Sequence, residues 1–152
     1  MNIDLENNVN HRLAAVAAQS KRLIYRIISE SGLSITPEQW MVLYQLWQED
    51  GLTIGQLASN TKKDFANITR VVELLVRDGY IRKVKNPKDK RSCCVFILPK
   101  ANEIKEDIQN VFHSMTKLSL KGINSKEQIF LLDILARIES NVAGELEKRD
   151  AD

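Results

Sequence analysis

The stretch DFANITRVVELLVRDGYIRKVKNPKDKRSCCVFIL, residues 64–98, decides the fold. It begins with Asp64, a residue type that caps helix N-termini, and continues with an amphipathic segment over 65–77. Gly79 then ends the helix. Two segments that look like strands, 80–84 and 93–98, flank a turn that contains Asn and Pro, which predicts a β-hairpin. A basic helix followed directly by a hairpin is therefore expected.

Further helices are expected before this stretch. A long amphipathic helix is predicted over 4–29 and ends at Gly32. The motifs TPEQ (36–39) and TIGQ (53–56) both have capping-box spacing, and each predicts the start of a helix. The second helix is expected to be short, through Ala58, with a polar turn of four to five residues before Asp64.

Two more helices are expected after the hairpin. Apolar residues recur at helical spacing from Ile104 to Leu118, with a stop near Gly122. A capping box at 125–128 opens a final helix whose apolar face is expected to point inward: Ile129, Leu132, Leu135, Ala136, Val142 and Leu146.

The predicted fold is mainly α with a small β-hairpin. Two helices joined by a short turn, the second basic and followed by a hairpin, are typical of a winged helix-turn-helix. We predict a winged helix-turn-helix lobe at 33–99. Long N- and C-terminal helices, in 1–32 and 100–152, form a dimerisation region, and the whole is one compact domain.

Composition and motifs exclude several classes of protein. The chain of 152 residues is 43% hydrophobic and 28% charged, as in an ordinary globular protein. No apolar run approaches the roughly 20 residues of a membrane span, and the N-terminus lacks the pattern of a signal peptide, so a cytoplasmic location is expected. A Gly-rich phosphate loop, a nucleophile elbow and paired catalytic carboxylates are all absent from the sequence, so we predict neither an enzyme nor a cofactor.

The charge is distributed unevenly along the chain. Of its 22 Lys and Arg and 20 Asp and Glu residues, ten basic and four acidic residues lie between Lys62 and Arg91. The remainder of the chain is net acidic. A basic segment in an otherwise acidic chain is typical of one surface that meets a polyanion, although an exposed basic helix without a partner has the same composition.

Residues 64–98 resemble the recognition helix and wing of the multiple antibiotic resistance regulator (MarR) family. Three features have that family's spacing: Thr69-Arg70, Gly79 with Ile81, and the triplet Asp89-Lys90-Arg91. Helix order and length extend the resemblance more weakly to the whole chain. One departure is Leu98-Pro99-Lys100-Ala101, where the family usually has a Thr and a Gly.

The helix over 65–77 has two faces. Phe65, Ile68, Val72 and Leu75 are expected to pack in the core, and the opposite face carries Ala66, Asn67, Arg70, Glu73 and Arg77. A major groove admits such a helix, and we predict that Asn67 bonds adenine, Arg70 bonds guanine or phosphate, and Thr69 bonds phosphate. Arg77, on the same face, is also a predicted DNA contact. The alternative is an exposed helix face without a ligand.

The hairpin turn, NPKDK, has two interpretations of its own. Charge at a hairpin tip can simply keep its edge solvated. Beside a recognition helix, however, the tip would meet the DNA backbone or minor groove, and we predict that Arg91 makes this contact. The resemblance implies that Asp89 orients this Arg and shapes the wing. We predict that Lys62, Lys63, Lys88 and Lys90 bind phosphates.

An aromatic stripe follows the TPEQ motif, at Trp40, Tyr44 and Trp47. We predict core packing for it. The rival hypothesis, implied by the resemblance, is the wall of a pocket for a small aromatic or amphipathic effector, with Arg12, Arg22 and Tyr25 as its polar groups.

Two cysteines and two histidines give weaker signals. Cys93 is expected to face the core, and neighbouring strand residues point to opposite faces, so no disulfide is predicted. Redox sensing is not expected, since sensors that resemble this chain carry their reactive Cys in the first helix. His11 and His113 have no partner at metal-ligand spacing, and no metal is predicted.

The predicted function is a homodimeric, sequence-specific DNA-binding regulator, most simply a repressor, on a pseudo-palindromic operator. A winged-helix adaptor that binds protein rather than DNA is the alternative, and it would interact without salt dependence.

Overall fold

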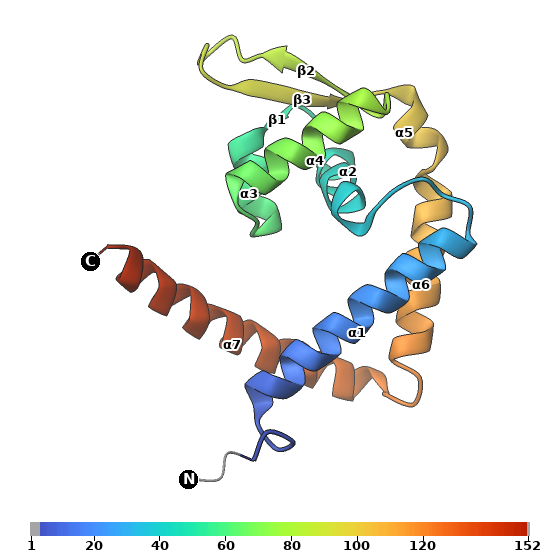
Figure 1. Ribbon diagram of the computed structural model, residues 1–152, viewed down its shortest axis with the longest axis vertical. Coiled ribbons are helices and arrows are strands. Elements are labelled where there is room, and N and C mark those ends of the chain that lie inside the picture. The colour runs from blue at the N-terminus through green and yellow to red at the C-terminus, as the bar shows by residue number, and fades with distance from the viewer. Residues whose placement is uncertain (1–3, 152) are drawn as a thin grey trace. The chain divides into compact units, whose positions relative to one another are not determined.

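The structure is a computed structural model that describes residues 4–151. Its elements, labelled in Figure 1, are α1 (Val9–Glu30), α2 (Pro37–Gln48), β1 (Leu52–Thr53), α3 (Ile54–Thr61), α4 (Phe65–Arg77), β2 (Ile81–Lys85), β3 (Cys93–Ile97), α5 (Pro99–Glu103), α6 (Lys105–Ser119) and α7 (Ser125–Asp150). The prediction of a mainly helical fold with a small β-structure is confirmed. The chain groups into two units, Met1–Thr116 and Lys117–Asp152. Each unit is described by itself.

Three helices of the first unit begin at caps that the sequence predicts. The reciprocal side-chain and backbone hydrogen bonds of both capping boxes, Thr36–Gln39 and Thr53–Gln56, are present. Asp64 caps α4, because its Oδ1 accepts a hydrogen bond of 2.8 Å from the backbone N–H of Asn67. Gly79, with φ +78°, follows α4 in the left-handed region that favours glycine. Local capping chemistry therefore sets where the helices of the lobe begin and end.

The turn between α3 and α4 is tighter than predicted. α3 continues to Thr61 rather than Ala58, and only residues 62–64 separate the two helices. The buried hydroxyl of Thr61 donates to the carbonyl oxygen of Leu57 at 2.7 Å, which satisfies it inside the helix. Lys62 then turns the chain in a left-handed conformation, with φ 54°. Because Thr61 is polar, the sequence pattern did not predict that α3 extends to this residue.

The hairpin belongs to a three-stranded antiparallel sheet with the order β1-β3-β2. Lys83 of β2 and Leu52 of β1 lie opposite the same residue of the central strand, Val95. The hairpin strands are predicted within one residue of their observed ends. β1 is not predicted, because two residues are too few to show strand alternation.

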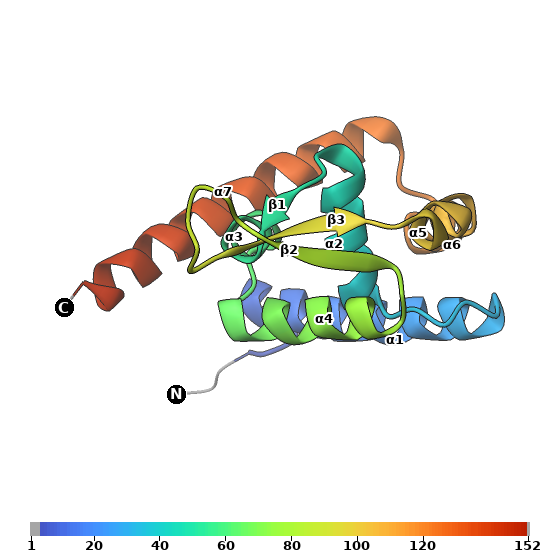
Figure 2. The same cartoon turned by 90° about the horizontal axis from the view of Figure 1, so that it is seen from above.

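The hairpin lies next to α4. β2 starts four residues after α4 ends, and it runs back along the helix. In both views the tip of the hairpin lies toward the end at which α4 begins (Figures 1 and 2). The residues of the turn and the first turn of α4 are therefore on the same side of the lobe.

One hydrophobic core holds the first unit together. Its fully buried large side chains are Leu43, Leu46, Leu57, Leu75, Ile81, Ile108, Val42, Val72 and Val95. α4 contributes a stripe of Ile68, Val71, Val72 and Leu75, each no more than 3% exposed. The prediction that Phe65 belongs to this stripe is wrong, since its side chain is 60% exposed. Phe65 is the first residue of α4 and lies one turn beyond the edge of the core.

Two helix boundaries at the ends of the chain differ from the predictions. α1 begins at Val9, where Asn8 accepts a hydrogen bond from the backbone N–H of His11 at 3.0 Å, and not at residue 4. The last helix is capped by Asn124 rather than Ser125. In both cases an Asn side chain supplies the cap one or more residues away from the predicted start.

The helix predicted after Pro99 is divided. Pro99 occupies the first position of the short α5, and Ile104 interrupts the helix before α6 begins at Lys105. This break directly follows the segment in which the sequence departs from the MarR pattern.

The long helix α7 has no buried residue among those described. The predicted inward position of its apolar face is wrong for the single chain: Ile129 is 68% exposed and Leu132 is 65% exposed. An amphipathic pattern predicts an apolar face but does not specify what covers it. Within residues 4–151, no helix has both the length and the apolar character needed to cross a membrane.

Candidate nucleic-acid interface

The outer face of α4 is polar and accessible. Arg70 and Arg77 are exposed, and Asn67 is half-buried at the edge of the same face. The buried stripe of α4 fixes the rotation of the helix, so these three side chains keep their places relative to the core. A core-anchored helix with an Asn and an Arg in its first two turns has the chemistry that base edges require.

Two predicted contact residues on α4 already have partners in the protein. The hydroxyl of Thr69 donates to the carbonyl oxygen of Phe65 at 2.8 Å, so its proton is not free to bind a phosphate oxygen. Arg77 Nε donates to Asp78 Oδ1 at 2.8 Å, and this hydrogen bond raises the pKa of Arg77 above its ordinary value. Their roles at DNA stay predictions, and each would require a change of partner.

The turn before α4 brings two cations to the start of the helix. Lys62 and Lys63 are both exposed, and Lys62 is itself the left-handed residue at the end of α3. The N-terminus of α4 adds a partial positive charge of its own, part of which the capping carboxylate of Asp64 offsets. The exposed lysines are therefore the main source of positive charge at this end of the helix.

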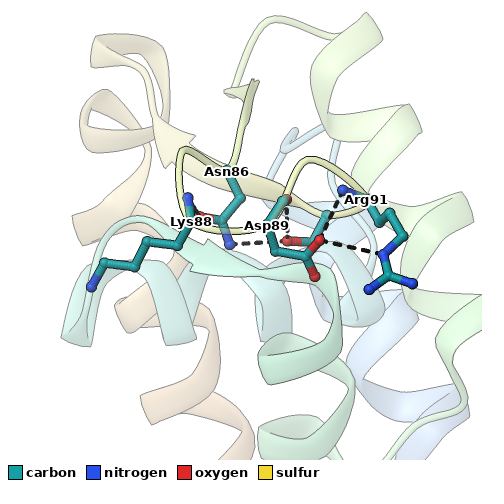
Figure 3. A network of polar contacts seen from close by, with 5 residues as sticks. Asn86, Lys88, Asp89 and Arg91 are labelled. Carbon is teal, nitrogen blue, oxygen red and sulfur yellow. Dashed lines mark hydrogen bonds and ion pairs between the residues drawn. The ribbon is translucent and has the colours of Figure 1, made fainter.

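The wing tip, residues 86–92, is closed by its own polar side chains, as Figure 3 shows. Asn86 Nδ2 donates to the hydroxyl of Ser92 at 2.9 Å, and Asn86 Oδ1 accepts from the backbone N–H of Lys88 at 3.0 Å. Asp89 Oδ1 accepts from the backbone N–H of Arg91, also at 3.0 Å. These bonds shape the turn and leave the cationic heads of Lys88, Lys90 and Arg91 outside it.

Asp89 also contacts the guanidinium group of Arg91. The Asp89 Oδ1 atom lies 3.7 Å from Arg91 Nε, and the Arg91 side chain is 95% exposed. An exposed ion pair of this kind contributes only about 0–1 kcal/mol to stability. Its effect is on direction instead: one carboxylate holds both the backbone and the side chain of the arginine. This geometry supports the orienting role that the family resemblance implies for Asp89.

A cluster that the sequence did not reveal joins α1 to the start of α2. The Tyr25 hydroxyl donates to Glu38 Oε2 at 2.6 Å, and Lys21 Nζ lies 3.0 Å from Glu38 Oε1. Burial, together with the hydrogen bond to Glu38, raises the pKa of Tyr25 to about 12, while the charge of Arg70 acts in the opposite direction. The charge of Arg70 on α4 is thus felt at this cluster.

The Glu38 carboxylate is the centre of that cluster. Burial alone would raise its pKa, but hydrogen bonds from Tyr25, from its own backbone and from Lys21 together lower it to about 2. The only signal in the sequence is an acidic residue in the first turn of a helix. The partners lie 13 and 17 residues earlier, on α1, and no local pattern pairs them.

The aromatic stripe lines a groove at the edge of the core. The core face of α2 is made by Val42, Leu43 and Leu46, whereas Tyr44 is 44% exposed. The Trp40 ring stacks on Phe112 of α6 with 3.5 Å between ring centroids. A groove of about 220 Å³ is lined by Trp40, Tyr44, Trp47, Gln48, Lys105, Gln109 and Phe112. The prediction of core packing holds for Trp40 and Trp47, which are partly buried and pack against the core, but not for the exposed Tyr44.

The other predicted effector residues lie elsewhere on the first unit. Arg22 and Tyr25 line a separate, shallow hollow on α1 together with Ala18, Lys21 and Arg26. Arg12 is exposed on the same helix. Of the five predicted residues, the structure places Trp40 and Tyr44 in the groove and Arg22 and Tyr25 in the separate hollow.

The cysteines and histidines form no site. Cys93 and Cys94 are both half-buried and free of a disulfide. Along β3, Cys93 points to the same side as the fully buried Val95, so it lies on the core face of the strand but is only partly covered. Cys93 lies opposite Lys85, at the end of the hairpin next to the turn. Within the described part of the chain, no three His, Cys, Asp or Glu side chains are grouped to hold a metal ion.

Comparisons with known proteins agree with this geometry. Residues 35–93 match the model of the MarR family. The chain is 26% identical over 108 residues to the HTH-type transcriptional regulator TtmR of Methylorubrum extorquens, which covers 71% of this chain and 54% of TtmR. The chain therefore spans about half the length of that relative.

Two solved structures share the fold. One is the PcaV transcriptional regulator of Streptomyces coelicolor in complex with its natural ligand, with a TM-score of 0.84, 23% identity and coverage of 92% of this chain and 97% of that one. The other is a mutant MarR from E. coli complexed with operator DNA, with a TM-score of 0.78, 23% identity and coverage of 86% and 92%. At this level of identity the likeness establishes the winged helix-turn-helix fold.

Proposed function

We propose that this chain binds specific sequences of double-stranded DNA. The premise is that residues 35–93 belong to the MarR family of transcription regulators. The family is one of regulators and not of enzymes. The observation that carries the proposal is the placement of the basic residues. Lys62, Lys63 and Arg70 are exposed before and within the first two turns of α4, and the tip of the hairpin lies toward the end at which this helix begins (Figures 1 and 2). DNA-binding lobes need such a surface for phosphate contacts.

Two parts of this surface have different tasks in the proposal. The outer face of α4 enters the major groove, where Asn67 and Arg70 meet base edges. The wing tip meets the backbone or the minor groove beside it, where Arg91 and its neighbouring lysines neutralise phosphates. In this proposal the charged turn is a DNA contact rather than only a solvated hairpin tip.

The test is selection from random DNA by the purified full-length protein. We expect enrichment of a short motif. The affinity for that motif, measured by fluorescence anisotropy, is expected to fall linearly when log affinity is plotted against log salt concentration. Failure to enrich any sequence, with binding insensitive to salt, would favour the adaptor and contradict the proposal.

We further propose that the chain acts as a homodimer. The support is the exposed apolar face of α7, on which Ile129, Leu132, Val142 and Leu146 are each more than half exposed. Large apolar faces of this kind mark association surfaces. A second copy, related by a two-fold axis, would cover the face and set two lobes about one helical turn of DNA apart.

Sedimentation of the full chain tests this second proposal. The wild-type protein is expected to be a dimer, and Leu132→Glu is expected to shift it to monomer or to aggregate. Asn141→Glu, on the polar side of the same helix, is the control and should leave the dimer intact. A wild-type monomer at micromolar concentration would contradict the proposal.

We also propose that the groove between α2 and α6 accepts a small aromatic or amphipathic effector. Ring faces of Trp40, Tyr44 and Phe112 line it, and Lys105 offers a cation, with its Nζ 5.5 Å from the Trp47 ring. The groove is smaller than most drug-sized pockets, so the effector would be small. Quenching of tryptophan fluorescence by a panel of aromatic acids and amines tests this. Quenching equal in wild type and Trp40→Ala would contradict it.

In this proposal the protein acts in the cytoplasm as a repressor: it lowers transcription while it is bound to DNA, and the effector releases it. A promoter carrying the selected motif is expected to be less active when the protein is present. Higher reporter activity with the protein would identify an activator instead.

A further inference from the structure

Phe65 is an apolar side chain at an unexpected place in the lobe. Within residues 33–99 the three exposed large hydrophobic side chains are Tyr44, Phe65 and Val84, at 44%, 60% and 37%. Phe65 is the most exposed of them, and it is the first residue of α4. Single exposed apolar residues are common and need no explanation by themselves. Phe65, however, lies at the start of the helix that carries the basic face.

The surroundings of Phe65 are polar and point to a ligand with negative charge. Lys62 and Lys63 precede it in the turn and are exposed. The nearby carboxylate of Asp64 is turned to the backbone, where it caps the helix. The next residue, Ala66, is exposed and small, so it leaves room for another surface to approach. An apolar ring between phosphate-binding cations and a small residue fits a surface that is anionic at its edges and apolar at one point.

The backbone of Phe65 is held in place. Its carbonyl oxygen accepts a hydrogen bond from the Thr69 hydroxyl at 2.8 Å, one turn further along α4. The helix is in turn anchored by its buried stripe, from Ile68 to Leu75. The ring therefore projects from a fixed point, as a side chain that discriminates between ligands must.

The major groove of DNA offers one apolar group for such a ring. Among the four bases only thymine presents a methyl group there, and Phe is one of the side chains that contact it. The residues at the N-terminal end of a recognition helix are also those that reach base edges. We infer that Phe65 is a specificity-determining residue that packs on the C5-methyl group of a thymine in each half-site. This inference rests on the proposed DNA binding.

The test compares thymine with uracil, which differs only in this methyl group. A duplex is selected from random DNA by the wild-type protein, and the same duplex is synthesised with deoxyuridine at every thymidine position. Anisotropy then gives the affinities of wild type and Phe65→Ala for both duplexes. Val84→Ala, on the wing, is the matched control, because a wing contact in the minor groove or on the backbone does not reach this methyl group.

The wild type is expected to bind the thymine duplex more tightly, by about fourfold for each methyl group that is contacted. Phe65→Ala should bind both duplexes with the same, weaker affinity, and Val84→Ala should keep the wild-type preference. Equal preference for thymine in wild type and Phe65→Ala would overturn the inference, as would no preference in either. Failure to select any duplex would instead refute the proposed function, so the two failures are distinct. Since Phe65 is exposed, its replacement should not affect folding, which circular dichroism checks.

Discussion

The recognition helix α4 and the wing tip, residues 86–92, carry the same kind of charge but are held in different ways. α4 is fixed by four buried side chains that belong to the central core. The wing tip is closed by hydrogen bonds among its own side chains and backbone, and its ion pair between Asp89 and Arg91 is exposed to solvent. A helix that cannot rotate is suited to base recognition, whereas a self-contained turn can adapt to the DNA backbone. The difference in anchoring thus separates reading from positioning.

The largest expected effect tests the anchoring of α4. Leu75 is fully buried. Leu75→Ala is expected to lower the free energy of unfolding by about 2–5 kcal/mol, because it removes packed methyl groups and leaves a cavity. Denaturation by urea measures this. Val84→Ala on the wing, with its partly exposed side chain, is the control and should change stability by no more than about 0.5 kcal/mol. Similar losses in both variants would remove the distinction between the two regions.

A smaller effect is expected at the reading face of α4. Asn67→Ala should weaken binding to the selected operator by about 1–3 kcal/mol in each half-site, since a bidentate contact to adenine is lost. Binding to a scrambled duplex should change little. Fluorescence anisotropy with both duplexes measures the two values. An equal loss on both would show that Asn67 positions the helix rather than reads a base.

The wing should respond through salt. Arg91→Ala is expected to weaken binding to specific and scrambled duplexes by similar factors, because phosphate contacts carry little sequence information. The slope of log affinity against log salt should fall by about 1 for each wing, or about 2 for a dimer. Titrations at several salt concentrations give the slope. A loss confined to the specific duplex would assign base reading to the wing.

The smallest expected effect is also the least intuitive one. Asp89→Ala removes a negative charge close to DNA, and simple electrostatics predicts tighter binding. We expect slightly weaker binding instead, by less than about 1 kcal/mol, because the carboxylate that holds Arg91 is lost. Anisotropy at two salt concentrations measures this change. Tighter binding by the variant would leave Asp89 as a turn residue without an orienting role.

The features that the sequence predicts well are local. Helix starts at Pro37, Ile54 and Phe65 follow from caps within three residues, and the hairpin follows from one turn between two apolar runs. The position of Asp89 beside Arg91 is likewise a local matter. Such features depend on neighbours in the sequence, and the fold class follows from their order.

The features that it does not predict depend on what packs against them. Phe65 has the helical spacing of a core residue, but the first residue of α4 that is buried in the core is Ile68, one turn further along the helix. The apolar face of α7 has the right periodicity, but none of its described residues is buried. Glu38 joins partners on another helix, and the aromatic stripe of α2 meets α6 across a groove. Periodicity predicts that a helix has an apolar face, but it does not predict which element packs against that face.

The central claim is that α4 reads bases while the wing positions the lobe, and a single set of binding titrations tests it most directly. The affinity ratio of the selected operator to a scrambled duplex is measured for wild type, Asn67→Ala and Arg91→Ala at one salt concentration. We expect this ratio to fall by roughly tenfold or more for Asn67→Ala and to stay unchanged for Arg91→Ala, although both variants bind the operator more weakly. A ratio that falls for Arg91→Ala and stays unchanged for Asn67→Ala would contradict the claim.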